Sequence, residues 1–390
     1  MLAIFSAFTL WALLIFKGTV MYSSKLALST PLLYEARFEV PEEAEAETSA
    51  ELVETLHSIS ETTFKDCPHA MRSVHAKSHG LLHAKMHVLE DLPPMLAQGI
   101  FAKPGTWPVV MRFSTVPGDM LDDSVSTPRG LAIKVVGVEG DRLQGSENDV
   151  TQDFVMVNGP AFLTPGAKKF LSSLKLLAFT TDRAPTLKKA LSAVLRGTEK
   201  IIEAFGGESP TVIAMGGHPE THILGETFFS QVPMLFGPYM AKISIVPVSK
   251  ELQALTKSPL NVNGKPNGLR DAVIEFFMTY SAEWELRAQL CTNLESMPIE
   301  NASVVWPEDE SPYIAVARIV ATPQLAWSEA RSVAVDDGMS FSPWHGTTAH
   351  RPIGSIMRIR KVAYEMSARF RSEHNATKVV EPKNLDDFPI

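Results

Sequence analysis

The chain has 390 residues, of which 45% are hydrophobic and 21% are charged. This balance is typical of a large globular protein and argues against intrinsic disorder. The net charge of -8 and the lack of a basic stripe or nucleic-acid motif argue against nucleic acid as a partner. The only cysteines, Cys67 and Cys291, exclude a disulfide framework, although one bridge between them stays open.

The first 22 residues are predominantly apolar. Residues 1–16 carry no charge, and beyond Lys17 the apolar character continues to Tyr22. A bilayer span needs about 20 such residues, which is feasible if the Lys17 amine extends to the interface. A cleaved signal peptide is the alternative, although no basic residues precede the apolar run. We therefore predict an N-terminal membrane anchor or signal segment at 1–22, with a membrane-associated or secretory-pathway localisation.

An acidic, alanine-rich stretch follows at 41–52, with the sequence PEEAEAETSAEL. It predicts either a solvated linker or the start of a surface helix. We assign 23–55 to a linker and N-terminal arm, 56–378 to one folded domain and 379–390 to a short polar tail.

From residue 74 to residue 88 small or apolar residues alternate with polar ones, including four histidines spaced four apart at 75, 79, 83 and 87. On a helix these histidines would share one face and indicate a metal cluster. Strict period two instead favours a strand, with Gly80 as a bulge or bend. We predict the strand, in which at most one of the histidines is chemically special.

A helix is predicted near the C-terminus. The stretch from Ser355 to Arg371 lacks glycine and proline, and its apolar residues recur at intervals of three and four. Arg360 and Tyr364 then lie on one face, one turn apart. A guanidinium beside a phenol favours the phenolate, a hard oxygen ligand suited to ferric iron. The alternative is a surface cation stacked on an aromatic ring.

Four segments follow one another in the order and spacing 72–77 (RSVHAK), 108–119 (PVVMRFSTVPGD), 128–134 (PRGLAIK) and 351–371. In this order and spacing they resemble the catalase superfamily. The resemblance covers roughly residues 70–375. It is closer to the shorter, divergent catalase-like proteins that lack the C-terminal helical domain. It implies an α+β fold with a closed antiparallel β-barrel and surrounding helices, here preceded by the hydrophobic N-terminal helix.

The resemblance also implies a cofactor, one haem b, bound between the barrel and the C-terminal helix. Tyr364 matches the tyrosinate that ligates the iron, and Arg360 matches the arginine that supports it. Three further arginines match positions that hold the haem propionates through charge-assisted hydrogen bonds. These are Arg72, Arg112 and Arg371.

On the other side of the haem, His75 matches the family's distal histidine, which moves a proton between the two peroxide oxygens. Ser114 matches the serine that bonds the far ring nitrogen and fixes the tautomer. The family also has a peroxide-orienting asparagine, and here the pattern departs. If the following strand is aligned with the family without a gap, Thr151 occupies the position of this asparagine. If the alignment is allowed to shift, Asn148 occupies it.

These residues predict a haem-dependent oxidoreductase that acts on hydrogen peroxide or, preferentially, on an organic or lipid hydroperoxide, with peroxidase and weak catalase activity. Val155 and Met156 stand where the family pattern is aromatic, which leaves room for an apolar substrate. A lipid-hydroperoxide isomerase or lyase, similar to allene oxide synthase, and a non-catalytic haem-binding protein are the alternatives. A homo-oligomer stays open.

Overall fold

The computed structural model describes residues 29–125, 127–181, 218–386 and 388–389. The strands are β1 (Ser78–Val88), β2 (Thr106–Thr115), β3 (Arg129–Val136), β4 (Thr151–Val157), β5 (Phe228–Phe229), β6 (Met234–Phe236), β7 (Tyr239–Pro247), β8 (Ala282–Leu290) and β9 (Ile314–Ala321). The α-helices are α1 (Glu45–Asp66), α2 (Ala167–Thr181), α5 (Lys250–Gln253), α6 (Gly268–Phe277), α7 (Glu329–Ser332) and α8 (Ser355–His374).

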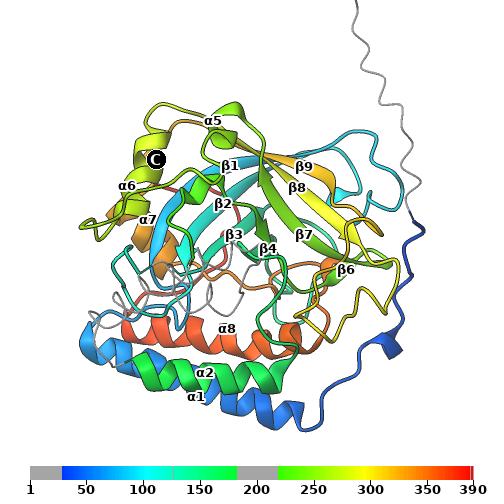
Figure 1. Cartoon of the computed structure of the whole chain (residues 1–390), viewed down its shortest axis with the longest axis horizontal. Coiled ribbons are helices and arrows are strands. Elements are labelled where there is room, and N and C mark those ends of the chain that lie inside the picture. The colour runs from blue at the N-terminus through cyan, green and yellow to red at the C-terminus, as the bar shows by residue number, and fades with distance from the viewer. Residues whose placement is uncertain (1–28, 126, 182–217, 387, 390) are drawn as a thin grey trace, which may run out of the picture.

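The strands form one antiparallel sheet that closes into a barrel. Their order is β5-β4-β3-β2-β1-β9-β8-β7-β6, and β5 also pairs with β7. This extra pairing makes eight of the strands a closed ring, with β6 as a hairpin partner of β7 beside it. Closure leaves few unpaired strand edges. The predicted α+β barrel with surrounding helices is confirmed (Figure 1).

Alternating side chains fill the barrel interior. On β8 the inward positions are Ala282, Trp284, Leu286, Ala288 and Leu290, which are all buried. Large rings dominate the packing, and Phe113 lies 6.2 Å from Trp284 between ring centroids. Since a buried aromatic side chain stabilises a fold by about 1.5–3 kcal/mol, these rings make the barrel a rigid support for the segments outside it.

The predicted strand at 74–88 forms only from Ser78 onward. His75 has a backbone φ of 57°, which breaks the extended chain. Its N–H donates to the carbonyl of Val116 at 2.7 Å rather than to a neighbouring strand residue. The predicted irregularity near Gly80 is confirmed, because the pairing register with β2 shifts between Ser78 and Gly80.

Helices α1, α2 and α8 form a layer along one side of the barrel (Figure 1). The predicted apolar face of α8 is buried in this layer, where Ile356, Ile359 and Met366 pack with Leu52 and Leu56 of α1. α1 starts within the acidic stretch, so of the two interpretations of that stretch the helix is the one observed.

Three glutamates from separate parts of the chain hold the first turn of α8. The backbone N–H of Gly354 donates to Glu39 at 3.1 Å, and that of Ser355 donates to Glu300 at 2.8 Å. Arg358 binds both of these glutamates and also Glu45 at the start of α1. Negative charge at a helix N-terminus is stabilising, so this network fixes where α8 begins.

The C-terminal tail packs on the outside of the barrel. Phe388 is only 8% exposed and shares a cluster with Leu81 and Phe341. Arg331 donates from Nε to the carbonyl of Pro389 at 2.8 Å. The residues assigned to a polar tail thus contribute a buried ring to this second core.

The predicted membrane-associated or secretory-pathway localisation is contradicted. Across 29–125, 127–181 and 218–386, no helix has both the length and the apolar character needed to cross a bilayer. The segment 1–22, on which that prediction rested, lies outside the described residues.

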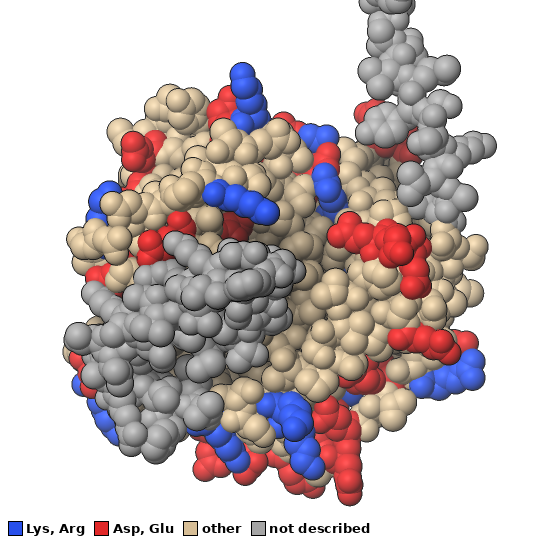
Figure 2. Space-filling model, viewed as in Figure 1, with Lys and Arg blue, Asp and Glu red and all other residues tan. Residues whose placement is uncertain are grey.

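On the face drawn in Figure 2, Lys and Arg side chains are interspersed with Asp and Glu, and its described part carries no continuous basic surface.

Candidate functional site

A cavity lies where the barrel strands β2, β3 and β4 meet α8. Its empty space is about 670 Å³ when the solvent at its open mouth is included. Six of the residues expected at a haem site line it together: Arg72, His75, Arg112, Ser114, Tyr364 and Arg371. Segments from both ends of the folded domain therefore converge on one space.

His75 lies in the turn before β1 and is held from three sides. Its Nδ1 is 3.1 Å from the Ser114 hydroxyl of β2. Its backbone N–H is bound to the Val116 carbonyl. Gly130 of β3 lies against the ring, and a Cβ there would be 2.5 Å from Nδ1 and 2.9 Å from the Ser114 hydroxyl oxygen. Only glycine leaves room for this ring position.

The environment of His75 keeps its imidazole neutral. Burial, and then the cations Arg112, Arg360 and Arg72, lower the pKa of His75 to about 3. At neutral pH the ring therefore carries one proton. If Nδ1–H donates to the Ser114 hydroxyl, the lone pair of Nε2 is free to accept a proton.

Tyr364 faces the same cavity from α8. Arg360 donates from Nη2 to the Tyr364 hydroxyl at 2.7 Å, and its guanidinium carbon lies 5.3 Å from the ring centroid. The two interpretations of this pair were a cation stacked on a ring and a guanidinium that supports the phenol oxygen. Both contacts are present, because Arg360 lies near the ring and also donates to the oxygen.

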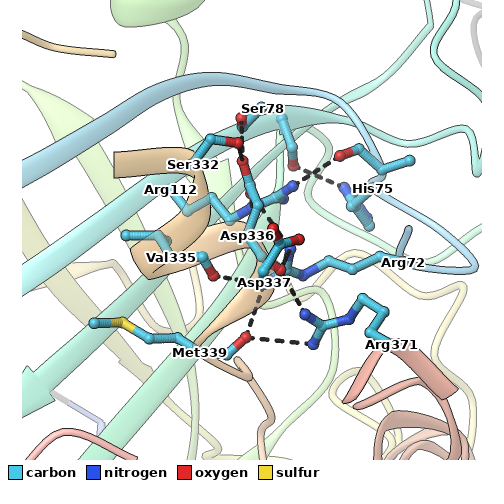
Figure 3. Close-up of polar contacts among 12 residues, drawn as sticks. Arg72, His75, Ser78, Arg112, Ser332, Val335, Asp336, Asp337, Met339 and Arg371 are labelled. Atoms are coloured by element: carbon cyan, nitrogen blue, oxygen red, sulfur yellow. Dashed lines mark hydrogen bonds and ion pairs between the residues drawn. The ribbon is translucent and has the colours of Figure 1, made fainter. Parts of the chain in front are cut away.

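Three arginines meet at one side of the cavity (Figure 3). Arg72 comes from the turn before β1, Arg112 from β2 and Arg371 from α8. Asp336 accepts from Arg112 Nε at 2.7 Å and from Arg72 Nη1 at 3.3 Å. Arg371 binds the backbone carbonyls of Asp336 and Met339.

The positive charge of these three arginines is not balanced by the Asp336 carboxylate. Asp336 is the one carboxylate, in the described part of the chain, that hydrogen-bonds any of the three guanidinium groups. Burial and the neighbouring Arg112 lower the pKa of Arg371 to about 10, and its Nε is buried without a hydrogen-bond partner. Buried excess cations need anions. The two carboxylates of a haem fit this requirement, as the Tyr364 oxygen fits its iron.

The two candidates for the peroxide-orienting group do not line the cavity. Asn148 is exposed on the loop before β4. Thr151 is buried, but its hydroxyl donates to Glu381 at 2.9 Å. Val155 and Met156 of β4 do line the cavity, so the corresponding wall is apolar. Neither predicted position therefore places a polar side chain in the cavity, since Asn148 is exposed to solvent and Thr151 is bound to Glu381.

A second cluster has the composition of a metal site. Asp153, His345 and Glu381 bring potential ligand atoms within 4.8 Å of one another. The Lys134 amine already lies among them, 2.8 Å from both carboxylate oxygens of Asp153 and in contact with Glu381. Burial lowers the pKa of His345, but the carboxylates of Asp153 and Glu381, each 3.3 Å from its Nδ1, outweigh burial and raise this pKa to about 9. Two cations therefore balance two carboxylates, and the cluster anchors the C-terminal tail.

The histidines that alternate along β1 do not gather around a metal within the described residues. His79 is completely buried, and its Nε2 lies 3.2 Å from the Thr115 hydroxyl. His87 lies at the other end of the strand beside Thr106. Of the four histidines only His75 lines the cavity, and it lies in the turn before β1. Cys67 and Cys291 are both free, the first exposed and the second buried.

Sequence reasoning missed Gly130 and Asp336, which complete the site. Gly130 lies in the segment PRGLAIK, where a glycine inside a strand pattern signals a close approach. Asp336 had no comparable signal, since it is one of two adjacent aspartates in a short π-helical turn, Val333–Asp337.

Comparisons with known proteins agree with this geometry. A family model described as catalase matches residues 44–185, which include β1 to β4 and the residues around His75. No curated protein sequence matches the chain significantly.

Solved catalase structures share the fold. A fungal catalase superposes with a TM-score of 0.56 at 17% identity, covering 84% of this chain and 68% of that chain. Catalase A from Saccharomyces cerevisiae gives 0.55 at 18% identity, covering 84% and 70%. A bacterial catalase gives 0.52 at 15% identity, covering 83% and 62%. The family model thus matches the part of the chain around His75, and the solved structures show that the chain shares the catalase fold.

Proposed function

We propose that this chain is a haem b peroxidase of catalase type that prefers organic hydroperoxides to hydrogen peroxide. The observation that carries the proposal is a single cavity lined by a neutral His75, bonded to Ser114, and by Tyr364, bonded to Arg360. A protein that only stored haem would not need an ordered acid-base pair beside the cofactor.

In this proposal Tyr364 would hold the iron through its hydroxyl oxygen, and Arg360 orients that oxygen through its hydrogen bond. The cluster of arginines around Asp336 binds the two propionates. A bound haem would supply the ferric centre needed for cleavage of a peroxide O–O bond. The protein supplies the orientation of the cofactor and the movement of the proton.

The proton is moved by His75. Its neutral imidazole can accept the proton of the peroxide oxygen nearest the iron at Nε2 and return it to the leaving oxygen. Ser114 keeps the tautomer and the ring orientation required for both halves of the transfer. General acid-base help of this kind contributes roughly 10²- to 10⁴-fold in rate.

The apolar wall supports the preference for an organic hydroperoxide. Val155 and Met156 line the cavity, whereas Asn148 and Thr151 do not. Dismutation needs a second hydrogen peroxide to be held and oriented by polar groups, and this wall offers none. Flexible and branched aliphatic side chains instead accommodate an alkyl group.

The test is a comparison of substrates on the haem-reconstituted full chain. Oxygen release from hydrogen peroxide should be slow, and oxidation of a reductant dye by cumene or fatty-acid hydroperoxide should be faster. Rapid oxygen release with no turnover of organic hydroperoxides would overturn the proposal. Rearranged lipid products formed without a reductant would indicate the isomerase or lyase, and haem binding without turnover would indicate a binding protein.

A further inference from the structure

The Asp336 carboxylate is held from behind as well as by the arginines. Its Oδ2 accepts from the hydroxyls of Ser78 at 2.7 Å and Ser332 at 2.9 Å. Trp327 in turn donates from Nε1 to the Ser78 hydroxyl at 3.0 Å. The other carboxylate oxygen of Asp336, Oδ1, faces Arg72 and Arg112. One oxygen is therefore fixed to the framework, and the other is fixed to the cations (Figure 3).

Asp336 lies behind the arginines as seen from the cavity. Arg72, Arg112 and Arg371 all line the cavity, whereas Asp336 does not. Burial would raise the pKa of Asp336, but Arg112 and Arg72 outweigh it and hold the pKa below its ordinary value. A carboxylate in this place does not compete with a ligand for the cavity. It determines which N–H groups of the guanidinium planes remain for a ligand.

Backbone carbonyls in and beside the turn that carries Asp336 accept further hydrogen bonds from Arg72 and Arg371. Arg72 donates from Nη2 to the carbonyls of Val335 and Met339, both at 3.1 Å. Arg371 donates to carbonyls of the same turn. Arg112 uses Nη2 for the Ala76 carbonyl at 3.0 Å and has no hydrogen bond from Nη1 within the described residues. Arg72 also donates from Nη1 to the Asp336 carbonyl at 2.9 Å. Within the described residues, the guanidinium nitrogens without a hydrogen bond are therefore Arg72 Nε, Arg112 Nη1 and Arg371 Nε, and all three residues line the cavity.

We propose that Asp336, anchored by Ser78 and Ser332, is a positioning residue that orients Arg72 and Arg112 toward the two carboxylates of a bound porphyrin. The inference rests on the proposed function, since it takes haem as the occupant of the cavity. A positioning role and a simple counter-ion role predict opposite effects of Asp336 on the affinity for haem. A counter-ion that a ligand displaces would weaken haem binding, whereas a residue that orients its partners strengthens it.

The experiment measures haem binding rather than turnover. The haem-free full chain and its Asp336→Asn variant are titrated with haemin and, separately, with haemin dimethyl ester, whose carboxylates are blocked. Asp336→Asn should weaken haemin binding by about 10- to 100-fold, the usual effect of losing a residue that orients a ligand-holding group. Its effect on the ester should be small, because the oriented arginines have no carboxylate to bind.

Asp337→Asn is the matched control, since Asp337 is the next residue and its carboxylate pairs with His69 at 3.0 Å. It should leave both affinities within about twofold of wild type. If Asp336→Asn does not fold, Ser332→Ala and Ser78→Ala each remove one anchor and should give a smaller loss, again for haemin only. Unchanged or tighter haemin binding, or an equal loss with the ester, overturns the inference. Failure of the wild-type chain to bind haemin at all would instead overturn the proposed function.

Discussion

Arg360 donates a 2.7 Å hydrogen bond to the hydroxyl of Tyr364 one turn further along α8. The bond is local, since both residues belong to the same helix, and it does not depend on how the barrel and α8 are placed. The first turn of this helix is fixed by Glu39 and Glu300. The phenol and its charged donor therefore form one preformed unit, of which Tyr364 lines the cavity.

Replacing Tyr364 tests whether this unit binds the metal. Tyr364→Phe removes the oxygen while keeping the ring, so the reconstituted protein should lose haem or show a different visible spectrum. Tyr280→Phe is the control, because Tyr280 is 49% exposed and remote from the cavity lining. An unchanged haem content and spectrum in Tyr364→Phe would exclude the tyrosine as ligand. Arg360→Ala should give a milder change.

Replacing His75 separates chemistry from binding. His75→Ala should slow hydroperoxide turnover by roughly 10²- to 10⁴-fold through loss of proton transfer, while haem content stays unchanged. His87→Ala at the other end of β1 should keep wild-type turnover. Because burial lowers the pKa of His75 to about 3, the wild-type rate should show no acid limb between pH 5 and 8. A rate that falls below pH 6.5 would contradict this environment.

Gly130 offers a test of how closely His75 must be placed. Gly130→Ala puts a methyl group 2.5 Å from the imidazole and 2.9 Å from the Ser114 oxygen, so the ring has to tilt away from Ser114. Turnover should fall by at least tenfold with haem still bound. Gly159→Ala is the control, since the nearest atom to its Cβ is 3.6 Å away. Equal activities of the two variants would show that the ring tolerates displacement.

Stability should fall in acid because several buried histidines are neutral in the folded state. Burial lowers the pKa of His222 and His350 to about 4, and lowers that of His79 well below its ordinary value. The unfolded chain takes up these protons near pH 6.5. The stabilisation is therefore fully present above pH 6.5 and is lost toward pH 4. Thermal unfolding of the haem-free chain at pH 7, 6 and 5 should show a falling midpoint, with a shallower slope in His222→Gln.

The anchor of the C-terminal tail can be tested by breaking one buried ion pair. Glu381→Gln leaves Lys134 and His345 with too little negative charge and should cost about 3–5 kcal/mol in the free energy of unfolding. Glu373→Gln on the exposed side of α8 should change it by less than about 0.5 kcal/mol. Adding Lys134→Met to Glu381→Gln should recover part of the loss. An unaffected Glu381→Gln would show that the tail is not held by this pair.

The elements that follow from a local period could be predicted, and those that depend on distant contacts could not. The 3.6-residue period places Arg360 and Tyr364 on one face of α8, as observed. Period two identifies β1 but overestimates its length, because the conformation of His75 is set by hydrogen bonds to a loop forty residues away. Such bonds leave no trace in the residues around His75.

Similar reasoning applies to the polar groups of the site. Asp336 and Asp337 are adjacent and indistinguishable in local pattern, yet only Asp336 meets the guanidinium groups of Arg72 and Arg112. Asn148 and Thr151 were proposed from an alignment position, but Asn148 is exposed on the loop before β4 and Thr151 of β4 donates to Glu381. A motif identifies residue types, whereas the approach of separate segments decides which of them meet.

Closure of the barrel has a consequence for the order of folding. The β1–β9 pair joins Lys85 to Val320, so the ring cannot close until nearly all of its sequence is present. His75 precedes the first strand of this ring and Tyr364 follows the last. Pairings between residues so far apart in sequence make folding slow. The two halves of the cavity therefore meet late, and a partly folded chain would retain little cofactor. Acquisition of bound haem would then mark the last stage of folding.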